Sequence, residues 1–563
     1  MERIKLSNFR KIKDSWDLDL APITFFTGTN NSGKSTVIKS LLVLEDYVKS
    51  NNHFELNFNG QNFHKHKIEN YKNAINRVNF REFNKDIHLE YQNNGFEISI
   101  LFQPGVHYYN GTLKKLKMVR TDKATLEIDL VSLNNYQLKV DALLLNQNDK
   151  ENIEDKKDKL KTLALLQTTS NLINFDKKEL KELEKEIEKY TDEIQLIDKS
   201  NFHLENIKKE NSDVFINKYK SLISENRKKI FELNQTIADT EKKLKILQKK
   251  RNEIVHQKKD HLTYSPTFSV DDFDISNRRI DKIIRTVLPK YLVENNLGQD
   301  RKKNNFKNSD QSLELDKANK LGDELLLALS FNVTHLSPHR SNQNKLFLHE
   351  IKDVDINYLV KNHFEKQLHS DLTVLEFMKK WMSKNYFDIG DDYRITTYES
   401  TVSKIEVFEG ESWINLSDKG FGAGQVFSIL LAIASSIIEN HKKINEKGAL
   451  FEEDLSIILI EEPEANLHPK LQSLLAELFL EANLKFGINF ILETHSEYMI
   501  RMSQIIVKQI NEKEENTKIP FEAYYFDKDA KPYSMIYRKD GKFTNEFGSG
   551  FFDVSSNLAF DIL

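Results

Sequence analysis

A glycine-rich segment close to the N-terminus has the composition of a phosphate-binding loop. Within FFTGTNNSGKST, Gly28 to Ser35 fits the spacing G-x-x-x-x-G-K-[ST]. Gly28 and Gly33 let the backbone curl so that successive N–H groups point inward, and the following helix N-terminus adds partial positive charge. We expect Lys34 to neutralise the β- and γ-phosphates of a nucleotide, and the Ser35 hydroxyl to ligate Mg²⁺. An apolar strand before the segment and a helix after it support this prediction.

Two glutamates at the end of an apolar run supply the carboxylates that phosphoryl transfer needs. The run LSIILIEEPEANLHP begins with an apolar strand, Leu455 to Ile460, and Glu461 and Glu462 follow it. Open α/β sheets bind their ligands at this C-terminal edge. We expect Glu461 to reach the Mg²⁺ shell, directly or through water, and Glu462 to orient and polarise the attacking water. The alternative is a buried strand capped by two solvated acids.

A histidine ends the next apolar run. The segment INFILETHSEYMI indicates a strand that ends in Thr494, His495 and Ser496. A histidine at a strand end can sense a γ-phosphate by hydrogen bonding, although a single histidine is more often structural. The order of the three motifs along the chain favours the functional interpretation of His495.

A second glycine-rich turn opens a long apolar helix upstream of the acidic strand. The segment NLSDKGFGAGQVFSILLAIASSI carries Gly420, Gly422 and Gly424 where that helix begins. Backbone N–H groups at a helix N-terminus form another anion-binding site. One nucleotide cannot use both glycine-rich loops within a single compact fold, so the two loops need different nucleotides.

The remaining elements surround these motifs. Short alternating apolar runs in 1–27 indicate strands, and further short strands with turn residues from about 54 to 145 suggest an antiparallel lobe. Residues 259–330 form a connecting segment with a mobile polar loop, GQDRKKNNFKNSDQS. The C-terminal half, 331–563, then carries the remaining motifs and a predicted hairpin, YRITTYESTVSKIEVFEGESWINL.

Between these halves, residues 151–258 change composition to Lys, Glu, Leu and Ile, without glycine or proline. Apolar residues there recur at alternating spacings of three and four, which marks a heptad seam. The first series is Leu180, Leu183, Ile187, Tyr190, Ile194 and Ile197. We expect an antiparallel coiled-coil arm that projects about 65 Å at 1.5 Å per residue. Two long helices packed on the main body or in a bundle are the alternative.

Composition limits the classes of function. With 563 residues the chain has room for several domains, and 82 basic against 86 acidic groups leave a net charge of −4. A nucleic-acid surface would therefore be a local patch. The absence of cysteine excludes disulfides, thiol catalysis and thiolate metal sites. Because no apolar run approaches the roughly 18 residues of a membrane span, we expect a soluble, cytoplasmic protein without a membrane partner.

Taken together, the motifs resemble those of ABC-type ATPases of the SMC and OLD kind. The resemblance rests on GTNNSGKST, LSDKGFGAGQ, ILIEEPEANLHP and ILETHS, with a coiled-coil insertion after the first, and it covers roughly 1–150 and 320–563. Within this group, the motifs specifically resemble those of the stand-alone AAA-family ATPases of prokaryotic anti-phage systems such as Septu, retron-associated and PARIS modules. It implies an α/β fold: an ABC-type P-loop ATPase head with an antiparallel β lobe and an inserted coiled-coil arm.

The resemblance also implies domains and roles. The head is formed by 1–150 and 331–563, joined through the coiled-coil insertion 151–258 and the connecting segment 259–330. Catalysis would involve Lys34, the second Walker B acid Glu462 and the switch histidine His495. The implied nucleotide-binding (Walker A) residues are Gly28, Asn31, Ser32, Gly33, Lys34, Ser35 and Thr36. The implied Mg²⁺ ligands are Ser35 and Glu461. The signature residues, which in this class meet the ATP of the opposite subunit in a head-to-tail dimer, are Ser417, Gly420, Gly422, Gly424 and Gln425. Glu464 to Pro469 would cross the dimer interface.

Two positions depart from the family pattern. The signature usually has serine directly before its paired glycines, but if Gln425 takes the last place, Gly422 stands there and Ser417 lies five residues earlier. Which atom meets the opposite γ-phosphate therefore stays open. The Walker B metal position is usually Asp, and Glu461 is one methylene longer, so the metal could be held through water. Two candidates remain for the glutamine that usually links nucleotide to lobe, Gln61 and Gln103.

Two functions are compatible with these motifs. OLD nucleases carry a C-terminal TOPRIM domain, but only 68 residues follow His495 and YYFDKDAKPYSMIYRKDGKF favours a polar hairpin, so we expect ATP hydrolysis without intrinsic nuclease activity. The first function is an ATP-dependent sensor and scaffold that regulates an effector, such as an HNH nuclease or a TOPRIM toxin, with phage or DNA as trigger. The alternative is a DNA-clamping SMC-like ATPase of repair or recombination. A small-molecule kinase explains neither the arm nor GFGAGQ.

Overall fold

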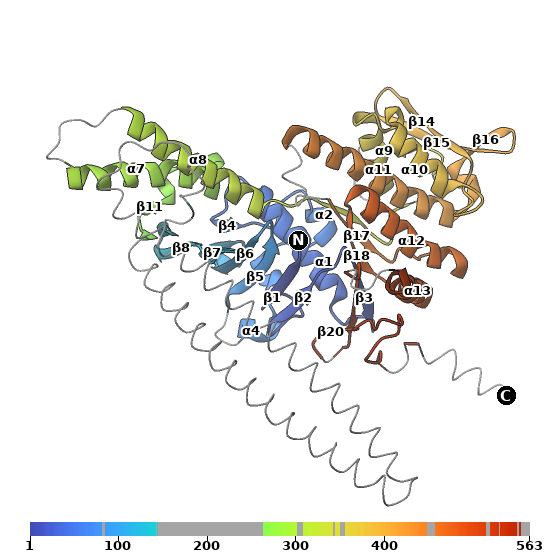
Figure 1. Ribbon diagram of the computed structural model, residues 1–563, viewed down its shortest axis with the longest axis horizontal. Helices are drawn as coiled ribbons and strands as arrows, with labels where there is room; N and C mark the ends of the chain where they lie inside the picture. The colour runs from blue at the N-terminus through green and yellow to red at the C-terminus, as the bar shows by residue number, and fades with distance from the viewer. Residues whose placement is uncertain are drawn as a thin grey trace, which may run out of the picture. The chain divides into compact units, whose positions relative to one another are not determined.

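Figure 1 shows the computed structural model of the chain. It describes residues 1–81, 85–141, 144, 263–300, 308–341, 344–349, 355–447, 456–513, 518–528, 530–548 and 551–552. The chain forms two compact units, one made of Met1–Val140 with Ser265–Leu563 and one made of Asp141–Tyr264. The predicted coiled-coil arm lies outside the described residues, and strand β10 (Thr263–Tyr264) is described at the end of the second unit. The first unit contains every predicted site residue.

A mainly parallel sheet of six strands holds the predicted motifs. Its strands are Val333–Leu336 (β12), Ile457–Glu461 (β17), Asn489–Glu493 (β18), Ile23–Gly28 (β3), Phe521–Phe526 (β19) and Tyr533–Ser534 (β20), in that spatial order. Only the last pair is antiparallel, which confirms the predicted polar hairpin near the C-terminus. Strands β3 and β17 read ITFFTG and IILIE and are buried almost throughout, because both faces of a parallel sheet are covered.

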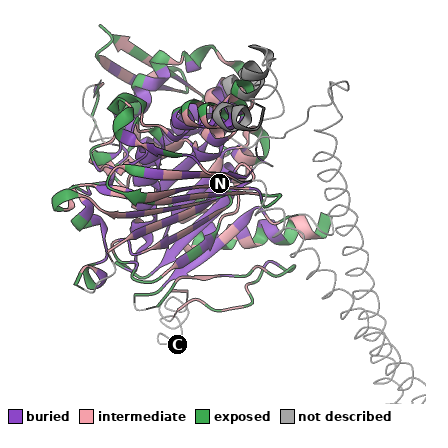
Figure 2. Cartoon of the chain, turned by 90° about the vertical axis from the view of Figure 1, so that its left-hand side faces the viewer, coloured by how far each residue is buried: buried purple, intermediate pink, exposed green. Residues whose placement is uncertain are grey.

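Four long helices accompany this sheet: Lys34–Lys49 (α1), Phe421–Lys447 (α11), Pro469–Phe486 (α12) and Glu497–Lys513 (α13). Helix α1 follows the glycine-rich loop directly, as predicted, and most of its residues are buried. Helix α12 has proline in its first turn and ends at Gly487, which takes the left-handed conformation that glycine adopts most readily at helix ends. Figure 2 shows buried residues concentrated along the strands and the inner faces of the helices.

Helix α11 corrects one expectation from the sequence. Its segment Phe421–His441 is 21 residues long and contains an 18-residue window with a mean hydropathy of 1.9, which is long and apolar enough to cross a membrane. The prediction that no apolar run approaches this length is therefore wrong. Of this window, 78% is buried inside the protein, and Phe427, Leu430 and Ile433 belong to the main hydrophobic core. Its apolar character is explained by burial in the core.

A large antiparallel sheet confirms the predicted β lobe and extends it to the N-terminus. The strands along it are Asn135–Asp141 (β9), Thr125–Ser132 (β8), Gly111–Arg120 (β7), Phe96–Pro104 (β6), Ile87–Asn93 (β5), Arg3–Ser7 (β1) and Trp16–Asp19 (β2). Thr267–Ser269 (β11) pairs with β9, and Glu55–Leu56 (β4) pairs with β7. Short helices between the strands are Phe63–His66 (α2), Tyr71–Ala74 (α3), Arg77–Arg81 (α4) and Val106–Tyr108 (η1).

A third sheet and its helices precede α11. Asp392–Tyr398 (β14), Val402–Glu409 (β15) and Ser412–Asn415 (β16) form an antiparallel meander, which confirms the predicted hairpin, and Phe347–Leu348 (β13) pairs with β15. The helical elements beside it are Asp355–Glu365 (α9), Leu368–Ser370 (η5), Leu372–Met382 (α10) and Leu416–Lys419 (η6). The last of these leads directly into the second glycine-rich turn.

Two helices occupy most of the connecting segment. Val270–Asp272 (η3) and Ile275–Asn277 (η4) precede Ile280–Asp300 (α7), which packs against Asn308–Leu329 (α8) (Figure 1). The predicted polar loop is wrong at both ends, because 298–300 complete α7 and 308–312 begin α8. Buried residues such as Leu288 and Leu325 anchor the two helices, and packing of an apolar face extends helices into sequence that alone favours a loop.

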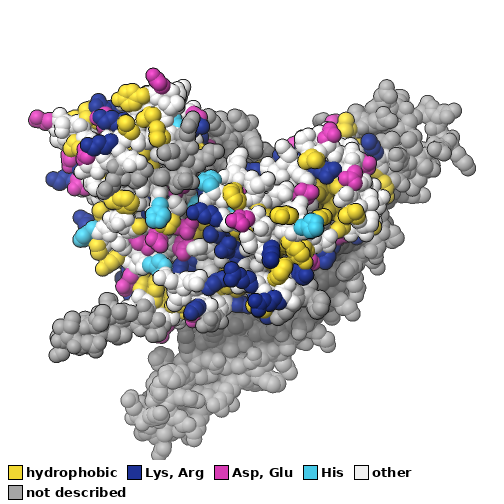
Figure 3. Space-filling model, turned by 180° about the vertical axis from the view of Figure 1, so that it is seen from behind, with side chains coloured by type: hydrophobic (Ala, Val, Ile, Leu, Met, Phe, Trp, Pro, Cys, Tyr) yellow, Lys and Arg dark blue, Asp and Glu magenta, His cyan; other side chains and the backbone are white. Residues whose placement is uncertain are grey.

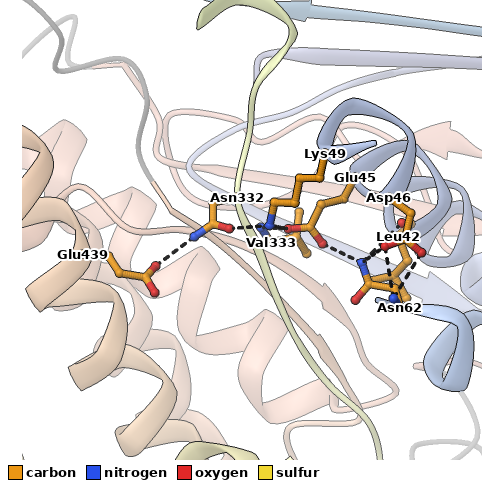
Figure 4. Close-up of polar contacts among 8 residues, drawn as sticks. All are labelled: Leu42, Glu45, Asp46, Lys49, Asn62, Asn332, Val333 and Glu439. Carbon is orange, nitrogen blue, oxygen red and sulfur yellow. Dashed lines mark hydrogen bonds and ion pairs between the residues drawn. The ribbon is translucent and has the colours of Figure 1, made fainter. Parts of the chain in front are cut away.

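Polar side chains join α1 to the start of β12 and to α11 (Figure 4). The Glu45 carboxylate is 2% exposed and accepts hydrogen bonds from Lys49 Nζ at 2.6 Å and from the backbone N–H of Val333 at 2.8 Å. Asn332 Oδ1 accepts from Lys49 Nζ at 2.8 Å, and Asn332 Nδ2 donates to Glu439 of α11 at 2.9 Å. The helix after the first glycine-rich loop is thus connected to the helix after the second.

Candidate nucleotide-binding site

The loop between β3 and α1 has a backbone that only glycine tolerates at its two motif positions. Gly28 has φ 126°, and a Cβ added there would lie 2.1 Å from the carbonyl oxygen of Phe526. Gly33 has φ 114° and caps α1, and a Cβ added there would lie 2.6 Å from the Trp16 ring. Both glycines therefore serve the backbone geometry that a phosphate-binding loop requires. Asn31 and Ser32 complete the turn between them, with Asn31 at φ 62°.

Lys34 lies inside this loop. Its side chain is 3% exposed, and Nζ donates hydrogen bonds to the carbonyl oxygens of Gly28 at 3.2 Å and Thr29 at 2.8 Å. Burial lowers the pKa of the Lys34 ammonium, while the negative charges of Glu493 and Glu462 raise it. The ammonium is held by weak neutral acceptors and distant carboxylates, so an incoming phosphate would be a stronger partner.

Strand register brings the acidic motifs to this loop. In the parallel sheet Glu461 pairs with Glu493, Glu493 pairs with Phe26, and Gly28 pairs with Phe526. The C-terminal ends of β17, β18, β3 and β19 therefore lie at one edge. The prediction that the acidic strand and the glycine-rich loop share a sheet edge rested on the general behaviour of α/β folds, and the register agrees with it.

Glu493 contacts the loop most directly, and only its place before Thr494 and His495 distinguished it in the sequence. The Ser35 hydroxyl donates to Glu493 Oε2 at 2.8 Å, and Lys34 Nζ lies 3.9 Å from Glu493 Oε1. Burial raises the pKa of Glu493 to about 7, with further contributions from the negative charges of Glu461 and Glu462. An acid at a strand end, next to a predicted switch histidine, was the available signal.

Glu461 is held by a second residue that sequence reasoning missed. His335 of β12 is 3% exposed, and its Nε2 lies 2.7 Å from Glu461 Oε1. Strand β12 runs parallel to β17, with His335 opposite Leu459, so the histidine reaches the end of the acidic strand. Nothing in FNVTHLSPHR indicated this contact, because it depends on which strands are neighbours in the sheet.

Glu462 occupies the turn that leaves the acidic strand. Its backbone has φ 48°, its N–H donates to the carbonyl oxygen of Glu493 at 2.7 Å, and its carbonyl accepts from Ala465 N–H at 3.0 Å. The residue is exposed at the sheet edge. A carboxylate in this place is open to water while its backbone is fixed, which suits the predicted role of orienting the attacking water.

The predicted switch histidine and the predicted interface turn contact each other. Glu464 accepts hydrogen bonds from His495 N–H at 2.6 Å and from Thr494 Oγ1 at 2.8 Å. Burial raises the pKa of Glu464. The His495 side chain is exposed, yet partial loss of water around the ring and the positive charge of Lys34 lower its pKa. The imidazole is therefore biased toward the neutral form, which can both donate and accept a hydrogen bond.

The signature residues pack against the interface turn of the same chain. A Cβ added at Gly422 would lie 2.7 Å from the carbonyl oxygen of Asn466, and one added at Gly424 would lie 2.5 Å from Ser341 Oγ. Ser417 Oγ donates to Asn415 Oδ1 at 2.8 Å. The side chain of Gln425 is fully buried, so it faces the interior of its own chain.

Among the described residues, no hydrogen bond or ion pair joins the signature segment 415–425 to the glycine-rich loop at 28–36. The structure thus brings together the Walker A and Walker B residues and His495, while the signature turn packs on the interface turn at Asn466 and on Ser341.

The oxygen donors at the sheet edge fit Mg²⁺. Within the described part of the chain no group of three acidic or histidine side chains could hold a metal by itself. Mg²⁺ is commonly held by one or two protein oxygens together with phosphates and water, so a complete protein cage is not needed. Ser35 and Glu493, which already share a hydrogen bond, and Glu461 beside them would hold the ion with a bound nucleotide.

The fold and the site together define a P-loop ATPase head of the ABC type with an antiparallel β lobe. The chain belongs to a known family: the sequence model described as an AAA ATPase domain matches residues 1–500. No curated protein sequence matches the chain closely enough to count as a relative.

Solved structures of SMC heads and of RecF are similar to the chain at low identity. The Smc head domain with an extended coiled coil from Pyrococcus furiosus, bound to the C-terminal domain of ScpA, is 11% identical to this chain. The match covers 100% of this chain and 98% of the Smc chain, with a TM-score of 0.29. The SMC head domain from Thermotoga maritima is 8% identical, with 93% and 94% covered and a TM-score of 0.25. The recombination mediator RecF is 12% identical, with 96% of each chain covered and a TM-score of 0.20. At such scores, the fold assignment rests on the strand order and loop geometry.

Proposed function

We propose that the protein is an ATP-dependent switch: two copies pair around ATP, and the pair regulates an effector, such as an HNH nuclease or a TOPRIM toxin, in defence against phage. The observation that carries the pairing is the open signature turn. Gly420 is exposed with φ 91°, and a Cβ added there would meet no atom within 4 Å. The N-terminus of α11 follows at once, so backbone N–H groups are available to a phosphate on a second copy.

Within one chain, each residue at the sheet edge has its own role in binding or hydrolysing ATP. The loop backbone and Lys34 bind the phosphates, and Ser35 with Glu461 or Glu493 would hold Mg²⁺, which neutralises phosphate charge when bound. Glu462 orients the attacking water and accepts its proton. His495, biased to the neutral form, hydrogen-bonds the γ-phosphate and responds to its loss.

Two substitutions test this assignment. Lys34→Ala removes the cation that meets the β- and γ-phosphates and should abolish ATP binding. Glu462→Gln keeps binding but should hydrolyse ATP slowly, and so trap the pair. Light scattering with ATP should then find Glu462→Gln as a dimer and Lys34→Ala as a monomer. A normal rate of hydrolysis by Glu462→Gln would disprove its catalytic role.

The defence role is supported by the resemblance of the four motifs to anti-phage ATPases. It is tested by plaque counts on cells that carry the protein together with the products of its neighbouring genes. Wild type should lower the plaque count, and Lys34→Ala should restore it to that of cells without the system. If Lys34→Ala protects cells as well as wild type does, the defence does not depend on ATP binding.

A second candidate, a DNA clamp, is favoured by a group of basic residues close to the sheet edge. Arg10 and Lys67 act electrostatically on Lys39, which also feels the negative charges of Glu461 and Glu493, and Arg77 acts on Arg10. Figure 3 shows Lys and Arg side chains gathered over part of one face. A duplex-DNA affinity that falls by several powers of ten between low and moderate salt would favour the clamp over the effector switch.

A further inference from the structure

A buried arginine holds the backbone of both Walker B acids. Arg340 is fully buried. Its Nη1 donates to the carbonyl oxygens of Glu461 at 2.8 Å and Ser337 at 3.0 Å, and its Nη2 donates to the carbonyl oxygen of Glu462 at 2.7 Å. A guanidinium presents its donors in a rigid planar fork. The fork therefore fixes two consecutive carbonyls relative to each other.

These two carbonyls lie where the strand ladder has ended. Strand β12 pairs with β17 only as far as Leu336 opposite Ile460, so no strand neighbour follows on that side for Glu461 and Glu462. Glu462 has a left-handed backbone at φ 48°, which non-glycine residues adopt rarely. Arg340 donates to both carbonyls beyond the last ladder pair and so holds this unusual turn in place.

The site around Arg340 is built for a charged group. Burial lowers the pKa of the guanidinium to about 10, and the carboxylates of Glu464, Asp355, Glu462 and Glu461 oppose the shift. Arg340 stays charged at neutral pH under these conditions. Its Nε is buried without a hydrogen-bond partner among the described atoms. An apolar side chain would remove the Arg340 donor from the Glu461 carbonyl and would leave the Glu462 carbonyl with Ala465 N–H as its donor, which is costly in a buried place.

The same loop contacts the signature helix. Ser341 follows Arg340, and its Oγ lies 2.5 Å from where a Cβ on Gly424 would be. Ser428 of α11 donates its hydroxyl to the carbonyl oxygen of Gly424 at 2.9 Å, and the same hydroxyl lies 3.5 Å from the carbonyl oxygen of Arg340. The segment 337–341 thus lies between the first turns of α11 and the turn that carries Glu462.

We propose that Arg340 is a positioning residue: it holds Glu462 in the conformation that hydrolysis needs and couples that conformation to the signature turn. The inference rests on the proposed role of Glu462 in ATP hydrolysis. Because no described hydrogen bond or ion pair joins Arg340 to the glycine-rich loop, its loss should affect the rate of hydrolysis and leave ATP binding intact.

Arg340→Ala and Arg340→Lys test the proposal in the full chain. With ATP affinity unchanged, kcat should fall by about 100-fold in Arg340→Ala, the scale on which a small misplacement of a reacting group acts. Lysine keeps the charge but cannot bridge two carbonyls, so Arg340→Lys should also be slow. Guanidinium at low millimolar concentration should partly restore kcat of Arg340→Ala, and ammonium should not. Arg538→Lys, at an exposed ion pair with Asp540, is the control and should behave as wild type.

The outcomes separate this inference from the proposed function. If Arg340→Lys is soluble and hydrolyses ATP at the wild-type rate while Glu462→Gln is inactive, the positioning role is wrong and the function stands. If Glu462→Gln is also active, the function itself fails. If Arg340→Ala does not fold, the hydrolysis rate of Arg340→Lys alone tests the positioning role. Loss of ATP affinity in a folded Arg340→Lys, or rescue by ammonium as strong as by guanidinium, would also overturn the positioning role.

Discussion

Glu461, Glu462 and Glu493 lie at one edge of the parallel sheet, and the negative charges of the first two act on Glu493. Glu493 is the most enclosed of them, with burial and the charges of Glu461 and Glu462 raising its pKa to about 7. The single ammonium of Lys34 compensates only part of this negative charge. A divalent cation bound at this edge would offset the remaining negative charge.

Glu493→Gln should stabilise the protein more at pH 8 than at pH 5. A folded-state pKa of about 7, above the unfolded value, means that the folded protein binds this proton more tightly. The contribution of Glu493 to stability is therefore present at low pH and is lost as the pH rises toward 7. Glutamine keeps the acceptor for Ser35 and has no proton to lose. The gain at pH 8 is at most about 3 kcal/mol, at about 1.4 kcal/mol per pKa unit.

Thermal unfolding midpoints of wild type and variant at the two pH values, without nucleotide or Mg²⁺, measure this difference. Glu512→Gln is the matched control, since Glu512 lies exposed on α13, far along the helix from the site. Equal effects of Glu493→Gln at both pH values would show that the carboxylate is not strained by its neighbours.

The residues that sequence reasoning found and missed differ in how they reach the site. Gly28, Lys34 and Ser35 were predicted because their roles depend on spacing within one turn. Glu461 was predicted because a strand end is recognisable in sequence. His335 and Arg340 were missed because their contacts depend on β12 lying beside β17, a neighbour relation across more than a hundred residues. The spacing of residues within a short segment is enough to predict the residues of the loop. The residues that support the loop depend on the order of the strands in the sheet.

At the scale of elements, the two helices that begin at glycine-rich turns are joined through the start of β12. Glu45 and Lys49 of α1 contact Val333 and Asn332, and Asn332 continues to Glu439 of α11 (Figure 4). Asn62, from the segment before α2, adds a hydrogen bond to Glu45 at 2.8 Å. Strand β12 also carries His335, so the junction lies next to the acidic strand end. A shift of α1 on nucleotide binding would therefore reach α11.

Glu45→Gln should weaken this junction. Glutamine has one acceptor oxygen where the buried carboxylate now serves three donors, so the Val333 N–H or the Asn62 amide is left unsatisfied. The expected loss is about 2 kcal/mol in the free energy of unfolding, the usual cost of a buried unpaired polar group. Urea unfolding of the full chain measures it. Glu365→Gln, from the exposed pair with Lys361, is the control and should change stability by less than about 0.5 kcal/mol.

Element boundaries were predictable where the apolar pattern of the sequence and the tertiary packing favour the same element. Strands β3 and β17 and the β14 to β16 meander follow their apolar runs. The segment GQDRKKNNFKNSDQS was expected to be a loop, but α7 and α8 enter it from both sides, because helix packing overrides local composition. The joining of β1 and β2 to the antiparallel lobe was also not foreseen, since β1 pairs with β5 more than eighty residues away.

For the whole molecule, no described hydrogen bond or ion pair joins the signature turn to the glycine-rich loop, the two parts that the proposed pairing would bring together at one phosphate site. The signature turn packs on the interface turn at Asn466, and the glycine-rich loop lies with Glu493 and Lys34. Pairing two copies head to tail would place the open N-terminus of α11 from one copy against the phosphates on the other. Each pair would then have two sites, and each site would need both chains.

Complementation between two inactive chains tests this arrangement. Lys34→Ala destroys the phosphate-binding half, and Gly420→Asp places a negative charge at the signature half, where open space surrounds the residue. Each variant alone should lose ATP hydrolysis. An equal mixture should recover hydrolysis, at no more than about half of the wild-type rate, because each mixed dimer has one intact site of two. Gly420→Ala has the same backbone strain at φ 91° as Gly420→Asp but adds no charge. Comparing the two variants therefore distinguishes repulsion of the phosphate from distortion of the turn. A mixture as inactive as its components, or normal hydrolysis by Gly420→Asp alone, would show that the signature turn does not complete the site of a second copy.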